Sequence, residues 1–172
     1  HTGDLEDAIV YGGSNEDGCL DEGGTAVSIA PDPGSDLSLA RCPDGTDSNA
    51  SGDDFQECMV EGGTPGTAND ACCGGGGSCD EAGAATLVIN EFMADPDGAD
   101  SGYEWFEIYN AGNGSIDVSG WRVSWFKSNP DSASGSAAIP SGTTIPSHGY
   151  LLIGDEGVSG IDLEASIDMG NG

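Results

Sequence analysis

Hydrophobic and polar residues in the middle of the chain alternate with the period of a β-strand in three successive runs. Residues 87–93 are mostly apolar, and residues 103–109 alternate so that every second side chain shares a face. Trp121, Val123 and Trp125 share one face of the third run. Turns rich in Gly, Asp and Asn separate these runs. Period-two alternation between such turns predicts an antiparallel β-sheet.

Three shorter runs, at residues 8–11, 25–29 and 36–41, predict further strands. Thirty glycines and eight prolines favour a chain with many turns. No stretch has the apolar stripe of an amphipathic helix, and none is long and apolar enough to insert into a membrane. The sequence therefore predicts an all-β protein.

Several motifs follow one another in a recognisable order. Asn-Glu closes the first strand at 90–91, EWFEIYN forms the second at 104–110, and VSGW follows a Gly-rich turn at 118–121. Two Ile-Pro pairs and a GYLLI run continue the order through residues 139–153. This order resembles the lamin-tail domain, in the version found in secreted bacterial and archaeal proteins. The resemblance implies an immunoglobulin-like antiparallel β-sandwich and supplies no activity.

The two halves of that domain stand in permuted order. Residues 1–69 resemble its C-terminal half, because Asp7 precedes an apolar run and TPGTAN closes the segment at 64–69. Residues 86–172 resemble its N-terminal half, and a Cys/Gly-rich linker at 70–85 joins the two. The last residues of the chain read directly into the first as one lamin-tail sequence.

Three interpretations of this order are open: one period of a tandem repeat, a subunit completed by its neighbour, or a permuted domain that closes on itself. Half a sandwich exposes strand edges and an apolar face, so each half needs its complement. Completion between chains, repeated head to tail, gives a filament. We therefore expect a structural subunit or repeat of an extracellular, calcium-stabilised filament or matrix, whose partners are copies of itself. The alternative is an adhesion or carbohydrate-binding module of a larger secreted protein.

The net charge of −28, from 31 acidic and three basic residues, argues against nucleic acid and anionic membranes as partners and favours divalent cations. Calcium takes carboxylate and carbonyl oxygens in Gly-containing loops. Two Asp-rich loops fit this chemistry, and each has a solvated acidic turn as its alternative. The first loop has Asp95, Asp97 and Asp100, and the second has Asp44, Asp47 and Asp54.

A second pointer to a cation is the pair Glu91 and Glu107. A hairpin that turns near residue 99 sets these two side chains opposite each other on neighbouring strands. Like charges in that position are destabilising, and a bound cation or a basic side chain would relieve them. The alternative is that both strand ends are solvated.

The chain has six cysteines. An even number in a Gly-rich acidic chain predicts disulfides and an extracellular, oxidising location. Zinc is the alternative, but paired CxxC spacing is absent. Of the possible pairings we expect Cys19–Cys42, Cys58–Cys72 and Cys73–Cys79.

The aromatic residues allow two readings. Tyr103, Trp105, Tyr109, Trp121 and Trp125 belong either to the core of the sandwich, the preferred reading, or to a sugar-stacking surface.

Other chemistry is sparse. Asn49 and Asn113 match the N-glycosylation acceptor pattern. His148 lies in a predicted turn, and no metalloprotease or nucleophile-base motif appears, so we do not expect an enzyme.

Overall fold

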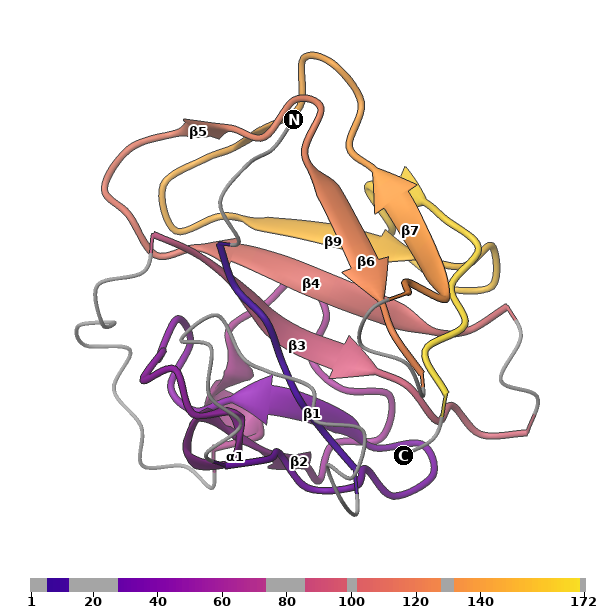
Figure 1. Ribbon diagram of the computed structural model, residues 1–172. Coiled ribbons are helices and arrows are strands. Elements are labelled where there is room, and N and C mark those ends of the chain that lie inside the picture. Colours follow the sequence, from indigo (N-terminus) through magenta and orange to yellow (C-terminus); the bar gives the residue numbers. More distant parts are fainter. Residues whose placement is uncertain (1–5, 13–27, 74–85, 99–101, 128–131, 171–172) are drawn as a thin grey trace.

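The computed structural model describes residues 6–12, 28–73, 86–98, 102–127 and 132–170. The largest sheet of the protein has six strands in the order β10-β9-β4-β3-β1-β2 (Figure 1). All neighbours in it are antiparallel except β9 and β10, which are parallel. The strands are β1 (Ser38–Arg41), β2 (Phe55–Cys58), β3 (Leu87–Met93), β4 (Trp105–Asn110), β9 (Tyr150–Gly154) and β10 (Leu163–Glu164).

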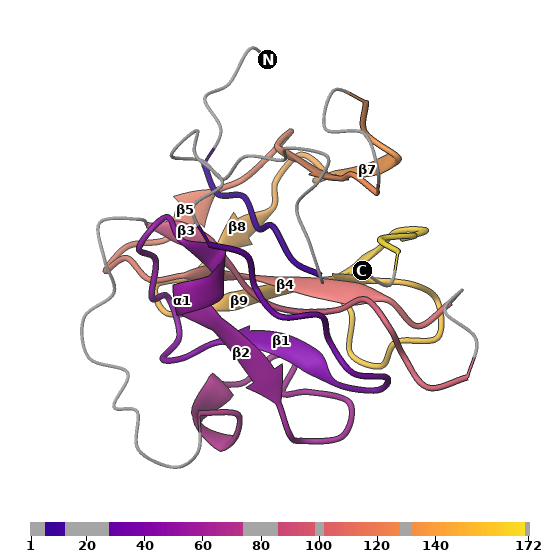
Figure 2. The ribbon, with the colours of Figure 1, turned by 60° about the horizontal axis from the view of Figure 1, so that its bottom comes forward.

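Two small antiparallel sheets complete the sandwich. One pairs β5 (Ile116–Asp117) with β8 (Thr144–Ile145), and the other pairs β6 (Arg122–Trp125) with β7 (Gly135–Ala138). Figure 2 shows β5, β7 and β8 above the long strands β4 and β9. Apolar side chains of both layers meet in one buried cluster, which holds the core together. The described helices are one-turn elements, α1 (Ser51–Asp54) and the 3₁₀ helix η1 (Asn69–Ala71), and none is long and apolar enough to cross a membrane.

The predicted hairpin of β3 and β4 has the expected register. Glu91 lies opposite Glu107, and a bulge falls between Ile89 and Glu91. Along β4 the alternate side chains of Phe106 and Ile108 join the main core. The alternation that the sequence predicts is therefore confirmed for this strand.

The opposite face of β4 is buried as well. Trp105 packs there with Met93 and Leu152 in a second apolar cluster. The core interpretation thus holds for Trp105, which is 3% exposed.

The N-terminal part of the chain packs on the C-terminal part of the same chain. Strand β1 pairs with β3, with Leu39 opposite Phe92. The segment at residues 6–12 crosses the sheet (Figure 1), and Ile9 packs against the main core. Tyr11 donates its hydroxyl to the carbonyl of Gly170 (2.8 Å), so the inner end of this segment contacts the last described residue.

Some predicted strands differ from the observed ones. Residues 8–11 form no ladder but one bridge, from Tyr11 to Ala30, because the segment crosses the strands and the Val10 amide donates to Ser51 Oγ. Of the run at 25–29, only residues 28–29 are described, and they are outside any strand. The run at 36–41 begins its strand at Ser38.

Two disulfides are present among the described cysteines. Cys58–Cys72 is confirmed, whereas Cys42 pairs with Cys73. The predicted Cys19–Cys42 and Cys73–Cys79 pairs are therefore wrong, and Cys19 and Cys79 themselves lie outside the described residues. The reason is the helix η1, which ends beside the paired strands β1 and β2 and sets two adjacent cysteines against two different partners. The first residues of the expected linker, 70–73, are thus linked to β2 and to the end of β1 by the two disulfides.

Candidate functional site

Arg41 is the charged centre of the second predicted calcium loop. Its guanidinium is buried, 2.9 Å from Asp7 and 3.1 Å from Asp54, with Asp47 at 3.7 Å. It also stacks 4.6 Å from the centre of the Phe55 ring. The structure therefore brings Asp47 and Asp54 together around an arginine side chain.

Asp7 ties the crossing segment to the sheet through the same guanidinium. Its Oδ2 also accepts the backbone amide of Ile89 at 2.6 Å. Burial raises the pKa of Asp7, and the neighbouring positive charge of Arg41 works in the opposite direction. The ion pair thus fixes residues 6–12 over β3.

Asp44, the third acid of that loop, lies in a separate network. Its Oδ1 accepts the amide of Asn69 (2.9 Å) and the side-chain amide of Asn90 (3.3 Å), and its Oδ2 accepts the hydroxyl of Tyr150 (2.7 Å). Burial and this hydrogen bond to Asp44 raise the pKa of Tyr150. Asp44 therefore links its loop to β3 and β9 rather than joining Asp47 and Asp54.

Glu91 is fully buried beside this network and accepts several hydrogen bonds. Ser38 Oγ donates to it at 2.5 Å, and Thr64 donates both its amide and its hydroxyl, each at 2.9 Å. Burial raises the pKa of Glu91 despite these donors. The carboxyl group anchors the loop that begins at Thr64.

Glu107 anchors the next part of that loop. It accepts the amide of Gly66 (2.5 Å) and the side-chain amide of Asn90 (3.2 Å). Burial, together with the charges of Glu91 and Asp44, raises the pKa of Glu107 to about 8. The predicted opposition of Glu91 and Glu107 is confirmed, and backbone, hydroxyl and amide donors satisfy the two carboxyl groups.

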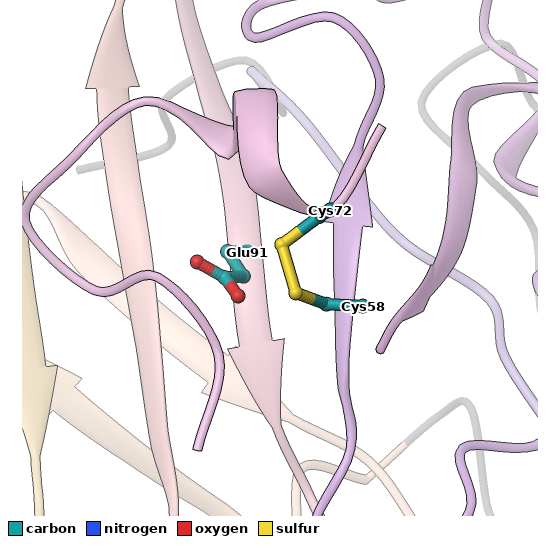
Figure 3. Close-up of side chains that lie close together, drawn as sticks. All are labelled: Cys58, Cys72 and Glu91. Carbon is teal, nitrogen blue, oxygen red and sulfur yellow. A yellow bond between two sulfur atoms is a disulfide. The ribbon is translucent and has the colours of Figure 1, made fainter. Parts of the chain in front are cut away.

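Figure 3 shows Glu91 beside the disulfide of Cys58 and Cys72. These three residues offer one potential ligand atom each, all within 4.8 Å of one another, and they are the one such group of three or more among the described residues. The two sulfur atoms are bonded to each other, so neither is the thiolate that a metal ion would require. These three residues therefore form a buried structural cluster, in which Glu91 binds the loop that begins at Thr64 (the Thr64 loop).

A groove of about 320 Å³ lies over the second apolar cluster, where the Thr64 loop meets the turn at 95–98. Met93 and Trp105 are buried beneath it, and Tyr103 at its rim is 52% exposed. We call it the Tyr103 groove. Its lining residues are Asp36, Gly62, Pro65, Met93, Pro96, Asp97, Tyr103, Trp105, Val158 and Ser159.

The ring of Tyr103 contacts the backbone of Gly157. A Cβ atom at Gly157 would lie 2.5 Å from Tyr103 Cε1, and the Gly157 amide donates to the carbonyl of Gly102 at 2.8 Å. The backbone of Gly157 therefore packs directly against the Tyr103 ring, which leaves no room for a larger side chain at residue 157.

Two carboxylates line the groove from different loops. Asp36 has a positive φ of 62°, and its amide donates to the carbonyl of Asp95 at 2.6 Å. Asp97 is exposed on the opposite loop. Neither carboxylate, nor the Tyr103 hydroxyl, accepts or donates a hydrogen bond within the described ranges, which leaves all three available to a ligand.

The remaining predicted site residues are spread out. Asp95 is half-buried, Asp100 lies outside the described residues, and Asn49 and Asn113 are exposed. Tyr109 is buried and bonded to His148 Nδ1 at 3.1 Å. Trp121 is exposed and Trp125 half-buried, so the core interpretation is wrong for Trp121, and it is also wrong for the exposed Tyr103.

Sequence reasoning singled out Asp97, Tyr103 and Trp105 but missed Asp36 and Ser159 as their neighbours. Asp36 sits in a short turn next to a strand, a position in which an aspartate carries no distinctive signal. Only the pairing of β1 with β3 brings it to the groove.

A family profile of the Lamin Tail Domain matches residues 80–170, just over half of the chain. The chain therefore belongs to the lamin tail domain family, with the all-β, immunoglobulin-like sandwich described above. No curated protein and no solved structure matches it.

Proposed function

We propose that the chain is an extracellular binding module that takes a carbohydrate in the Tyr103 groove. The observation that carries this proposal is the half-exposed ring of Tyr103, which packs against Gly157 at the rim of a groove. The carboxylates of Asp36 and Asp97 also line this groove. Ligand sites combine apolar and aromatic walls with a few polar groups that fix orientation. A sugar ring offers both an apolar face for the tyrosine and hydroxyls for the rim.

Two features support an independent, secreted module. The sheet is completed within one chain, so a neighbour is not needed to cover its core. The two disulfides favour an oxidising compartment.

Binding rather than catalysis is the proposed role. The buried carboxyl groups of Asp44, Glu91 and Glu107 are engaged by amide and hydroxyl donors of the protein itself. They act as anchors for the Thr64 loop, which forms one wall of the groove through Pro65.

A glycan-binding assay tests the proposal. We expect Tyr103→Ala to weaken binding about tenfold or more, since the stacking plane is lost, and Trp121→Ala to leave it unchanged. Trp121 is a matched control because it is an exposed aromatic residue that does not line the groove. Failure of the wild-type chain to bind any glycan, or equal binding by Tyr103→Ala, would contradict the proposal.

A structural role in a filament is the second candidate, favoured by one observation. The contacts that join residues 6–73 to residues 86–170, above all the pairing of β1 with β3, are between two segments connected through residues 74–85. Identical contacts between neighbouring copies would be an exchange of segments, which propagates if it does not close. The permuted order of the two half-domains that the sequence predicts would agree with this second role and with the first.

A further inference from the structure

We infer that the ligand of the Tyr103 groove carries protonated amines, and that its class is a 2-amino sugar polymer. This inference rests on the proposed carbohydrate-binding function and narrows its ligand. It is carried by the joint placement of two free carboxylates and an aromatic plane in one groove.

The groove is negatively charged. Asp36 and Asp97 line it, and its lining contains no lysine, arginine or histidine. The chain has three Lys and Arg residues in all against 31 acids. An anionic sugar, such as a uronate or a sulfated residue, would meet only repulsion, whereas an ammonium group would be attracted.

The basic residues of the chain are engaged elsewhere. Arg41 is buried among aspartates, Lys127 pairs with Asp168, and Arg122 donates to Ser136 Oγ. None of these three side chains therefore pairs with the two groove carboxylates, and the charge of Asp36 and Asp97 is available to a ligand.

Hydrogen bonding also favours an ammonium group in this groove. An ammonium group has three donors and a carboxylate has about four acceptor positions. The buried acids Glu91 and Glu107 already accept protein donors, but Asp36 and Asp97 accept none within the described part of the chain. Charge-assisted bonds of this kind are the stronger class of hydrogen bond.

The aromatic ring in the groove favours a sugar as the carrier of the amine. Tyr103 offers a ring face that attracts both a cation and the apolar face of a sugar. Beneath it, Met93 and Trp105 give an apolar floor. An isolated ammonium group on a flexible lysine stem would use the carboxylates but not the breadth of the floor, so a pyranose bearing an amine fits the groove better than a basic peptide.

Titration calorimetry tests the inference with soluble oligosaccharides in mildly acidic buffer, where the amines of the amino oligomer are protonated. The probes are an oligomer of 2-amino-glucose, its fully N-acetylated counterpart, a neutral glucan oligomer and an oligouronate. We expect the amino oligomer to bind about tenfold more tightly than the acetylated one, and more weakly as salt is raised.

Variants locate the effect. The double variant Asp36→Asn, Asp97→Asn should lose about tenfold or more in affinity for the amino oligomer, while Asp53→Asn, an exposed acid outside the groove, should change it less than about twofold. Asparagine tolerates the positive φ of residue 36, so the backbone should be preserved, which an unchanged thermal midpoint would verify.

The outcomes separate the inference from the proposed function. Binding of a neutral or acidic oligomer as tight as that of the amino oligomer overturns the inference and leaves carbohydrate binding standing. Binding of lysine peptides or calcium alone, or no binding of any oligosaccharide, overturns both.

Discussion

Arg41 carries more buried charge contacts than any other side chain described above. Its guanidinium contacts three aspartates. Asp7 lies in the crossing segment, and Asp47 and Asp54 lie between β1 and β2. We predict that Arg41→Ala lowers the free energy of unfolding by about 3–5 kcal/mol, because it leaves buried carboxylates without a counter-charge.

Urea unfolding measures this change, with Arg122→Ala as the exposed control. Arg41→Lys should restore only part of the loss, because an ammonium group cannot reproduce the forked donors of arginine. A loss below about 1 kcal/mol for Arg41→Ala would show that the aspartates do not depend on it.

Glu107 makes stability depend on pH in a direction that is set by its raised pKa. The folded value of about 8 lies above the ordinary value of 4.5, so the folded state holds the proton more tightly. This contribution is full below about pH 4.5 and is lost as the pH rises through about 8. Glu91, whose pKa is also raised, acts in the same direction.

The variant Glu107→Gln isolates this effect. We predict that the wild-type chain loses stability relative to Glu107→Gln as the pH rises from about 5 to about 8. Chemical unfolding at several pH values gives the difference. A constant or opposite difference would mean that Glu107 titrates normally in the folded chain.

At the scale of elements, the strands that could be predicted are those with long runs of alternating apolar and polar residues. β3 and β4 were predicted with their register because aromatic and apolar residues mark both. β2, with the sequence FQEC, and β7, with the sequence GSAA, lack a β-branched pattern and become strands only through their partners. Tertiary pairing, which the local pattern does not contain, decided these short elements.

The candidate site was predictable to a similar extent. Asp97 and Tyr103 stand close together in the sequence, but Asp36 reaches them only through the order of strands in the sheet. The grouping of Asp44, Asp47 and Asp54 failed for the same reason, because Asp44 turns toward Tyr150 and the other two toward Arg41.

The two disulfides staple η1 and its loop to the edge of the sheet. Cys42–Cys73 spans 31 residues and Cys58–Cys72 spans 14. We predict that Cys42→Ser with Cys73→Ser lowers the free energy of unfolding by about 3–4 kcal/mol, and that the shorter bridge contributes somewhat less.

Thermal unfolding of each double variant tests whether the longer bridge contributes more to stability than the shorter one. Alkylation without reductant should also leave all four of these cysteines unmodified. Labelling of Cys42 or Cys73 before reduction would contradict the assigned bridge.

At the scale of the whole molecule, the net charge of −28 leaves calcium binding as a prediction of the sequence. Millimolar calcium should raise the thermal midpoint by mass action, beyond the effect of sodium chloride at equal ionic strength. Asp97→Asn should reduce the rise. An identical midpoint in calcium and in excess chelator would rule out a stabilising ion.

The fold as a whole is completed by one chain. Residues 6–12 cross β3 (Figure 1), β1 extends the sheet next to it, and Tyr11 contacts Gly170, the last described residue. An independent binding module requires this closure, whereas a filament built by completion requires the same contacts between chains.

Light scattering coupled to size-exclusion chromatography, with and without millimolar calcium, tests this claim most directly. The account predicts the mass of a single chain over a wide range of concentrations in both conditions. A mass that grows with concentration or with calcium, and falls when Leu39→Glu breaks the core contact made by β1, would contradict the closed module and support exchange between copies.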